Sequence, residues 1–448
     1  MKDSAALKAL EGLLGIAFGR TGPEAGEVAA RILDAAGRCG WDAVADLAAE
    51  QGVAGLVSDG LQYLYDNCPG AENRLPADKL RYDLFATTLS RESEWARSVD
   101  SASRLAAIFA AGGLRTVVLK GAAFAALYPE PSHRDFGDLD IFLLNAEGEC
   151  ACEAGNALME KAGIAVDRSY YKNSSFRFEG LEVENHRFCT PVRGSASRKH
   201  FERLLQGLLK DGGLIPLGGP DHTHADSEAS IPNEGADGTG AKGFACACNS
   251  CGTGASGGGD SGTRQAESAA PGQCVLYSPP PLFNALLCVA HARFHFLFEG
   301  GITLRHVCDF AACIRGLANC ANCTDTSIVG CSSNDGGSSE SLRFESICRE
   351  YALLNFACAL GRASERVCGV KPPFDCPPDE KADCILLEGM LETGRSAPDY
   401  GNSLKSRLSR MLSYRSRSER FRAFSDTSAT AEILRTVFGY FFDRNPKL

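Results

Sequence analysis

The spacing of apolar residues predicts helices over the first hundred or so residues. Apolar side chains recur at helical intervals from Trp41 to Ala48 and again from Val53 to Leu64. Pro69-Gly70 interrupts this pattern. A long helix is then predicted from about Pro76 to Ala111, because proline is tolerated in a first helical turn. We therefore predict a helical region over residues 1–111.

After Gly112-Gly113 the pattern changes to short apolar and β-branched runs, which are typical of buried strands. Strands are predicted at Thr116–Leu119, Asp138–Leu144, Tyr170-Tyr171, Ser175–Phe178 and Leu181–Phe188, with helices at Ala122–Leu127 and Cys150–Ala162. Residues 112–211 are thus predicted to form a mixed α/β core. The expected fold class is α+β, with a small mixed-sheet core between N-terminal and C-terminal helical regions.

Two polar segments interrupt the later part of the chain. In residues 212–275 the composition becomes rich in glycine, and 10 of the 28 residues from Gly235 to Gly262 are glycine. Such a composition buries too little apolar surface to offset the entropy of ordering, so a disordered insertion is expected. A helical pattern then begins at Pro279. We predict a C-terminal helical domain over 276–448, with a polar insertion at 318–341.

Composition and charge indicate a globular protein and argue against a nucleic-acid partner. The chain has 448 residues, of which 44% are hydrophobic and 23% charged, as in globular proteins. Its net charge of −10 is unfavourable for contact with nucleic-acid phosphates, so no nucleic-acid partner is expected. The basic run from Gly401 to Arg422 is interpreted as a solvated helix face. With no signal-peptide or membrane-spanning pattern, we expect a cytoplasmic protein without a membrane partner.

Two groups can be distinguished among the twenty cysteines. Those within apolar runs are expected to behave as small hydrophobic side chains: Cys288, Cys308, Cys313, Cys348 and Cys358. Two further clusters, Cys246/Cys248/Cys251 and Cys320/Cys323, have spacings that zinc ligands use. Their flanks are rich in Gly, Ser and Asn, which favours solvated loops, and a zinc site there remains the alternative.

Asp138-Leu139-Asp140 is the candidate for chemistry. Alternate residues of a strand share a face at a separation of roughly 6.6 Å, so the two carboxylates can converge on divalent cations. Mg²⁺, as two ions, suits such oxygen ligands, with Mn²⁺ as the alternative. Either Glu182 or Glu184 of the later strand can complete the set as general base, and we favour Glu184.

The segment VVLKGAAFAALYPEPSHRDFGDLDIFLL resembles the signature of the uncharacterised nucleotidyltransferase family, in the DNA polymerase β-like nucleotidyltransferase superfamily. The matching residues are Leu119, Lys120, Gly121, Tyr128, Pro129, Arg134, Asp138 and Asp140. A second block, HARFHFLFEGGITLRHVCDFAACI, is also similar to the family pattern. The likeness covers about 40–200 and 279–445. Ala122 follows the glycine where the wider superfamily has Ser or Gly.

The resemblance implies that Asp138 and Asp140 bind the metal ions and act in catalysis with Glu184. Nucleotide binding is expected from Lys120, Gly121, Arg134 and Arg305. Gly121 lies between a strand and a helix, where backbone N–H groups can face a phosphate. Lys120 can pair with a triphosphate as a point charge, and the alternative is a solvated lysine at a strand end.

For two arginines and two histidines the sequence allows both a functional and a structural interpretation. Arg134 can bind phosphate as a planar fork or brace Asp138. Arg305 can reach the nucleotide phosphates or form an i,i+4 ion pair with Asp309. His291 and His295 share a helix face, which favours packing against the core over metal binding.

These observations predict metal-dependent transfer of a nucleotidyl group from an NTP, such as ATP, to an acceptor hydroxyl, with release of pyrophosphate. The acceptor is expected to be a small molecule or a protein. One alternative is a sugar-nucleotide-dependent glycosyltransferase, which also uses Asp-x-Asp, although about 100 helical residues precede the motif here. The other is a non-catalytic interaction protein that keeps the fold.

Overall fold

The computed structural model describes residues 2–21, 25–68, 72–211, 213–217, 276–320, 339–392, 413–443 and 446–448. The cluster Cys246/Cys248/Cys251, Cys323 and most of the predicted insertions lie outside these ranges. The five cysteines that were predicted to be small hydrophobic side chains are free and buried, as expected.

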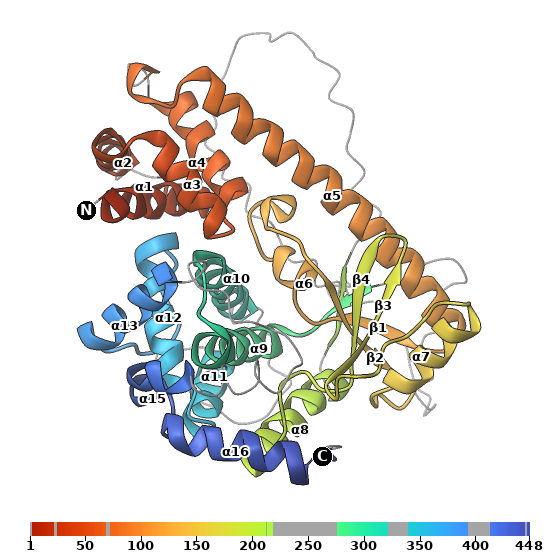
Figure 1. Cartoon of the computed structure of the whole chain (residues 1–448). Helices are drawn as coiled ribbons and strands as arrows, with labels where there is room; N and C mark the ends of the chain where they lie inside the picture. The colour runs from red at the N-terminus through yellow and green to blue at the C-terminus, as the bar shows by residue number, and fades with distance from the viewer. Residues whose placement is uncertain are drawn as a thin grey trace, which may run out of the picture. The chain divides into compact units, whose positions relative to one another are not determined.

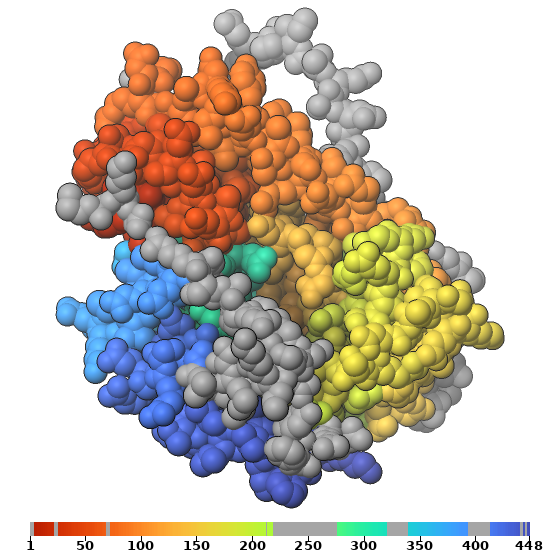
Figure 2. Space-filling model, in the orientation of Figure 1, coloured from red at the N-terminus to blue at the C-terminus, as the bar shows by residue number. Residues whose placement is uncertain are grey.

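The N-terminal region is helical, as predicted. Its helices are α1 (Lys2–Ala17), α2 (Ala25–Cys39), α3 (Trp41–Glu50), α4 (Ala54–Asn67) and the long α5 (Asp78–Ala111), with a 3₁₀ turn at Glu72–Arg74. In α5 the last carbonyls are satisfied by a turn at Gly112-Gly113, where Gly113 has a φ of 76° and its N–H donates to Ala110 O. Part of α5 lies at the surface of the molecule (Figure 2). Its side chains Tyr82 and Phe85 are 69% and 57% exposed.

A six-stranded mixed sheet follows, in the order β3-β4-β2-β1-β6-β5. Its strands are β1 (Arg115–Val118), β2 (Leu139–Leu144), β3 (Asn173–Phe178), β4 (Leu181–His186), β5 (Ile215–Leu217) and β6 (Leu276–Ser278). The intervening helices are α6 (Ala122–Ala125), α7 (Cys152–Lys161) and α8 (Ala196–Asp211), with a 3₁₀ turn at Pro131–His133. The expected α+β class is thus confirmed (Figure 1).

Two expectations about this region are corrected. Residues 215–217 belong to a strand, although 212–275 was predicted to be a disordered insertion. Likewise 276–278 pair with β1 in the sheet before the C-terminal helices begin. Strands of three residues are too short to show a clear periodicity, so the sequence pattern missed both.

The C-terminal part is helical in its described residues from Pro281 onward. Its helices are α9 (Pro281–Phe294), which continues as a π-helical turn (His295–Glu299), α10 (Leu304–Cys320), α11 (Ser339–Glu350), α12 (Leu354–Cys368), α13 (Glu380–Glu392), α15 (Ser418–Phe424) and α16 (Ala429–Phe442). The predicted polar insertion at 318–341 is therefore shorter at both ends, since α10 and α11 extend into it. Pro281–Glu299 is long and apolar enough to cross a membrane. However, 67% of that stretch is buried within the molecule, as in the core helix of a protein that does not span one.

The two faces of the sheet meet different hydrophobic cores. Leu139, Ile141 and Leu143 face the smaller core, which they share with α5 and α7 residues such as Phe109. Phe142 and Leu144 point to the opposite face and join the large core of the helical regions. Because side chains alternate along a strand, Asp140 shares the face of Phe142, on the side of α9 and α10.

Candidate functional site

The candidate site lies where β1 ends and β2 begins. These strands are antiparallel, with Val118 opposite Ile141, and Leu119 N–H donates to Asp140 O at 3.0 Å. This pairing places Lys120 beside Asp140. The adjacent β4 runs parallel to β2 with Asp140 opposite Glu184, so the two carboxylates lie on one face of neighbouring strands.

Asp140 receives two hydrogen bonds on one oxygen. Its Oδ1 lies 2.9 Å from Lys120 Nζ and 2.8 Å from His186 Nε2. The carboxylate is only 3% exposed. Burial by itself would raise the pKa of Asp140, but Lys120 and His186 outweigh burial and hold it well below its ordinary value. Asp140 is therefore an ionised carboxylate at neutral pH.

Glu184 and His186 complete this group. His186 Nε2 lies 3.2 Å from Glu184 Oε2, and its Nδ1 lies 3.1 Å from the carbonyl oxygen of Phe188. Burial acts to raise the pKa of Glu184, but the contact with His186 lowers it overall. The pattern of β4 contained the signal for His186, because it shares the face of Glu184 two residues earlier, but it had not been selected as a site residue.

Asp138 lies at the margin of the group. It precedes β2 and is exposed, and its pKa is raised by desolvation and by the nearby charge of Asp140. Of the three predicted carboxylates, the structure brings Asp140 and Glu184 together with His186, and leaves Asp138 outside that group.

Gly121 adopts a φ of 52° directly before α6, a conformation that side chains rarely adopt. The helix that follows has only four residues. Its dipole is correspondingly small, so the phosphate-binding role predicted for Gly121 rests on its backbone conformation. Lys120 carries the local positive charge: burial lowers its pKa, but Asp140 raises it overall.

Further basic side chains lie near the site: Lys172 and His306, which the sequence did not single out, and His291 and His295, which it did. Burial and the charge of Lys120 lower the pKa of Lys172. The rings of His291 and His295 are 4.3 Å apart, and His306 of α10 lies 5.7 Å from His295. Burial and the charge of Lys120 hold the pKa of His291 well below its ordinary value. His291 and His295 therefore lie beside the site and pack with His306.

Arg134 has a structural partner. Its Nε and Nη2 donate to the two oxygens of Asp309 at 2.7 and 2.9 Å, and its Nη1 donates to Asp135 O. Tyr128 Oη donates to the same Asp309 carboxylate at 2.6 Å. The planar fork of Arg134 is thus engaged by Asp309, and its predicted contact with phosphate stays a prediction.

The same contact corrects the interpretation of Arg305. Asp309 was the predicted i,i+4 partner of Arg305, but its oxygens are taken by Arg134 and Tyr128. Arg305 lies at the start of α10, where its N–H donates to Gln51 O. Its predicted contact with nucleotide phosphates stays a prediction.

The donor set of the group fits a divalent metal ion. Asp140, Glu184 and His186 each offer one ligand atom, and these atoms lie within 4.8 Å of one another. Within the parts of the chain that the structure describes, no other group of three such side chains is this close. Two ionised oxygens and one imidazole nitrogen are ordinary ligands for divalent ions.

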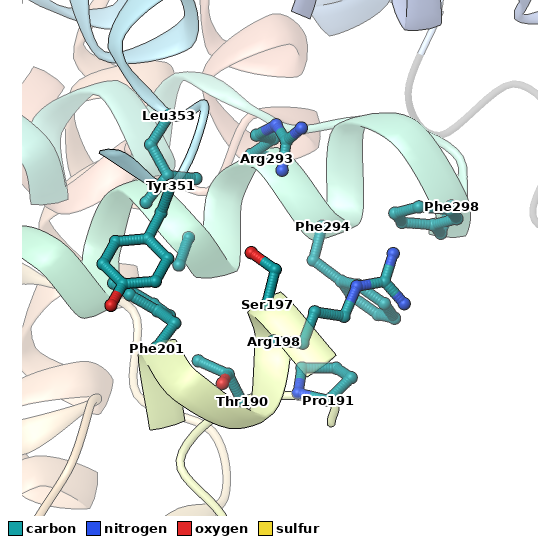
Figure 3. Close-up of a pocket in the computed structure, with 11 residues that line it drawn as sticks. Thr190, Pro191, Ser197, Arg198, Phe201, Arg293, Phe294, Phe298, Tyr351 and Leu353 are labelled. Atoms are coloured by element: carbon teal, nitrogen blue, oxygen red, sulfur yellow. The ribbon is translucent and has the colours of Figure 1, made fainter. Parts of the chain in front are cut away.

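A separate pocket lies between α8 and α9 (Figure 3). Phe201, Phe294 and Tyr351 contribute aromatic walls. Its two arginines bind the C-terminal region, since Arg198 pairs with Glu432 and Arg293 Nε donates to Phe424 O at 2.6 Å. None of the predicted site residues lines this pocket.

Comparison with known proteins supports the family resemblance. Residues 38–213 match the family described as "Uncharacterised nucleotidyltransferase". No curated protein and no solved structure matches the chain. The matched segment contains β1, β2 and β4, and therefore Lys120, Asp140, Glu184 and His186. The resemblance to the uncharacterised nucleotidyltransferase family is thus confirmed over residues 38–213.

Proposed function

We propose that the protein transfers a nucleotidyl group from an NTP to an acceptor hydroxyl in a metal-dependent reaction, and that pyrophosphate leaves. The observation that carries this proposal is the convergence of Asp140, Glu184 and His186 on one edge of the sheet within the family region. The acceptor is a small molecule or a protein side chain.

Asp140 and Glu184 would hold the metal, with His186 beside them. A bound divalent cation neutralises charge on the attacking and leaving oxygens of a phosphoryl group. Side chains of the protein must orient the triphosphate and accept the proton of the acceptor hydroxyl.

We assign proton acceptance to Asp138 and not to Glu184. Glu184 is part of the proposed metal-binding group with Asp140 and His186, whereas Asp138 lies outside that group. Asp138 is also exposed, so an acceptor can reach it. As the acceptor oxygen bonds to the α-phosphorus, its proton passes to Asp138 and the bond to the β-phosphate oxygen breaks.

Lys120 is the proposed ligand for the triphosphate. Its ammonium now pairs with Asp140 at 2.9 Å. With a divalent ion held by Asp140, Lys120 would no longer pair with that carboxylate and would be available to a phosphate oxygen. Lys172, on the strand side, adds a second positive charge near the carboxylates.

The structure disfavours the glycosyltransferase alternative. Such an enzyme should have a larger nucleotide-binding α/β domain before its Asp-x-Asp motif, whereas α1–α5 precede β1 here. If the protein only bound a partner, the buried and ionised Asp140, with Lys120 and His186 beside it, would have no function.

The test uses purified protein, each of the four NTPs in turn, Mg²⁺ or Mn²⁺, and a cell extract that supplies acceptors. Each NTP is labelled either on the α- or on the γ-phosphorus. We expect the α-label to enter a product and the γ-label to appear in pyrophosphate. Transfer of a labelled sugar from a sugar nucleotide, with no α-label in any product, would support the glycosyltransferase alternative instead.

A further inference from the structure

The ring of His186 is fixed from both sides. It is fully buried as the last residue of β4, and Asn185 before it points the other way, with its Nδ2 donating to Cys152 O at 3.0 Å. His186 Nδ1 lies 3.1 Å from Phe188 O. A carbonyl oxygen only accepts hydrogen bonds, so Nδ1 carries a hydrogen. The other nitrogen, Nε2, is left facing the carboxylates of Asp140 and Glu184.

His133 shows what a purely structural histidine looks like in this protein. Its Nδ1 lies 2.8 Å from Asp59 Oδ1 and its Nε2 lies 2.9 Å from Glu92 Oε1. Both nitrogens therefore donate to carboxylates, which requires the charged ring. In His186 only Nε2 faces carboxylates, and a bound metal ion would take the place of the proton on that nitrogen. The other nitrogen, Nδ1, donates to a backbone carbonyl, which is the arrangement that orients the histidine ligands of metals.

We propose that His186 is a metal ligand together with Asp140 and Glu184, and that its nitrogen makes the site select a divalent transition ion over Mg²⁺. This inference rests on the proposed metal dependence and deepens it. Mg²⁺ prefers an all-oxygen shell with several waters. An imidazole nitrogen instead favours first-row transition ions, whose affinity for N/O sites increases from Mn²⁺ through Co²⁺ to Cu²⁺.

The fixed positions of the three ligands add to the preference for a transition ion over Mg²⁺. Asp140 and Glu184 are opposite one another in paired parallel strands, and His186 follows Glu184 by two residues on the same face. The backbone therefore fixes all three positions before an ion arrives. Because His186 Nε2 lies 2.8 Å from Asp140 Oδ1 and 3.2 Å from Glu184 Oε2, an ion bound by both carboxylates would also meet this nitrogen.

The experiment measures binding of Co²⁺ and of Mg²⁺ to the full-length protein by calorimetry, and records the visible spectrum of the Co²⁺ complex. The variants are His186→Gln and, as a matched control, His133→Gln, which also removes a buried histidine from between two carboxylates. We expect wild type to bind Co²⁺ more tightly than Mg²⁺. In His186→Gln, Co²⁺ affinity should fall by at least roughly tenfold with a changed spectrum, while Mg²⁺ affinity changes little.

His133→Gln should bind both ions as wild type does. Equal losses of Co²⁺ and Mg²⁺ affinity in His186→Gln, with an unchanged spectrum, would show that His186 only braces the carboxylates. If His186→Gln does not fold, the preference of the site is measured with wild type alone, by titrating Mg²⁺ into the Co²⁺ complex and recording how much Co²⁺ is displaced. A wild type that prefers Mg²⁺ and still transfers nucleotide overturns this inference alone, whereas absence of any ion binding also overturns the proposed metal dependence.

Discussion

At the scale of single residues, the contacts of His133 connect two helices and a loop. The ring joins the 3₁₀ turn at Pro131–His133 to Asp59 of α4 and Glu92 of α5. Burial acts to lower the pKa of His133, but the two carboxylates raise it from 6.5 to about 9. The charged ring therefore ties the loop before β2 to the N-terminal helices.

This raised pKa predicts a pH-dependent stability. Because the folded-state pKa exceeds the unfolded one, the contribution of His133 is fully present below about pH 6.5 and is lost as the pH rises through about 9. His133→Gln should reduce the free energy of unfolding by about 1–2 kcal/mol near pH 6, after allowance for the exposure of Glu92. Urea titrations of both proteins should converge near pH 10; a constant difference across this range would refute a titrating His133.

At the scale of elements, the pairing of β2 with β4 determines which side chains meet. The alternation along β2 puts Leu139 and Ile141 in the smaller core and Asp140 on the opposite face. It could not predict that β4 lies parallel to β2 with Glu184 opposite Asp140, because strand order depends on the packing of the whole sheet. The strand pattern does put His186 on the face of Glu184, but its contact with Asp140 depends on this register and could not be predicted.

Close packing of α4 against the loop before β2 gives a test at this scale. A Cβ atom on Gly55 would lie 2.5 Å from the backbone oxygen of His133, whereas one on Gly37 in α2 would meet nothing within 4 Å. Gly55→Ala should therefore lower the free energy of unfolding by about 1–3 kcal/mol. Gly37→Ala should raise it by about 0.5–1 kcal/mol, as alanine does in a helix. Equal effects of the two changes in chemical denaturation would contradict the close approach of α4 to the loop.

At the scale of the whole molecule, the Arg134–Asp309 pair joins the loop before β2 to α10. These residues are 175 positions apart in sequence. The local i,i+4 pattern instead suggested that Asp309 pairs with Arg305, because sequence spacing reveals only neighbours along one helix. The sequence thus predicted the fold class and the carboxylates of the sheet, but not the contacts between distant segments.

Loss of this buried pair should be costly. Asp309→Asn leaves the buried guanidinium of Arg134 without a countercharge, so the free energy of unfolding should fall by about 3–5 kcal/mol. Tyr128→Phe removes only one hydrogen bond to the same carboxylate and should cost about 1–2 kcal/mol. Denaturant titrations compare the two variants; an Asp309→Asn variant no less stable than Tyr128→Phe would show that the ion pair contributes little.

Two neighbouring glutamates of β4 allow the most direct test of the proposed transfer reaction. Glu184 lies with Asp140 and His186, whereas Glu182 on the same strand face is half-exposed and pairs with Arg177. They are preferable to Asp140, whose replacement would leave Lys120 without its buried partner. The measurement is the rate at which α-labelled nucleotide enters product with wild type, Glu182→Gln and Glu184→Gln, after circular dichroism has shown that all three are folded.

The proposed site predicts that Glu182→Gln keeps a rate within about twofold of wild type, since a surface ion pair is worth little. Glu184→Gln should lose on the order of 10²–10³ in rate, as when one electrostatic group is removed from an active site. A folded Glu184→Gln protein that transfers nucleotide at the wild-type rate would contradict the assignment of catalysis to this edge of the sheet.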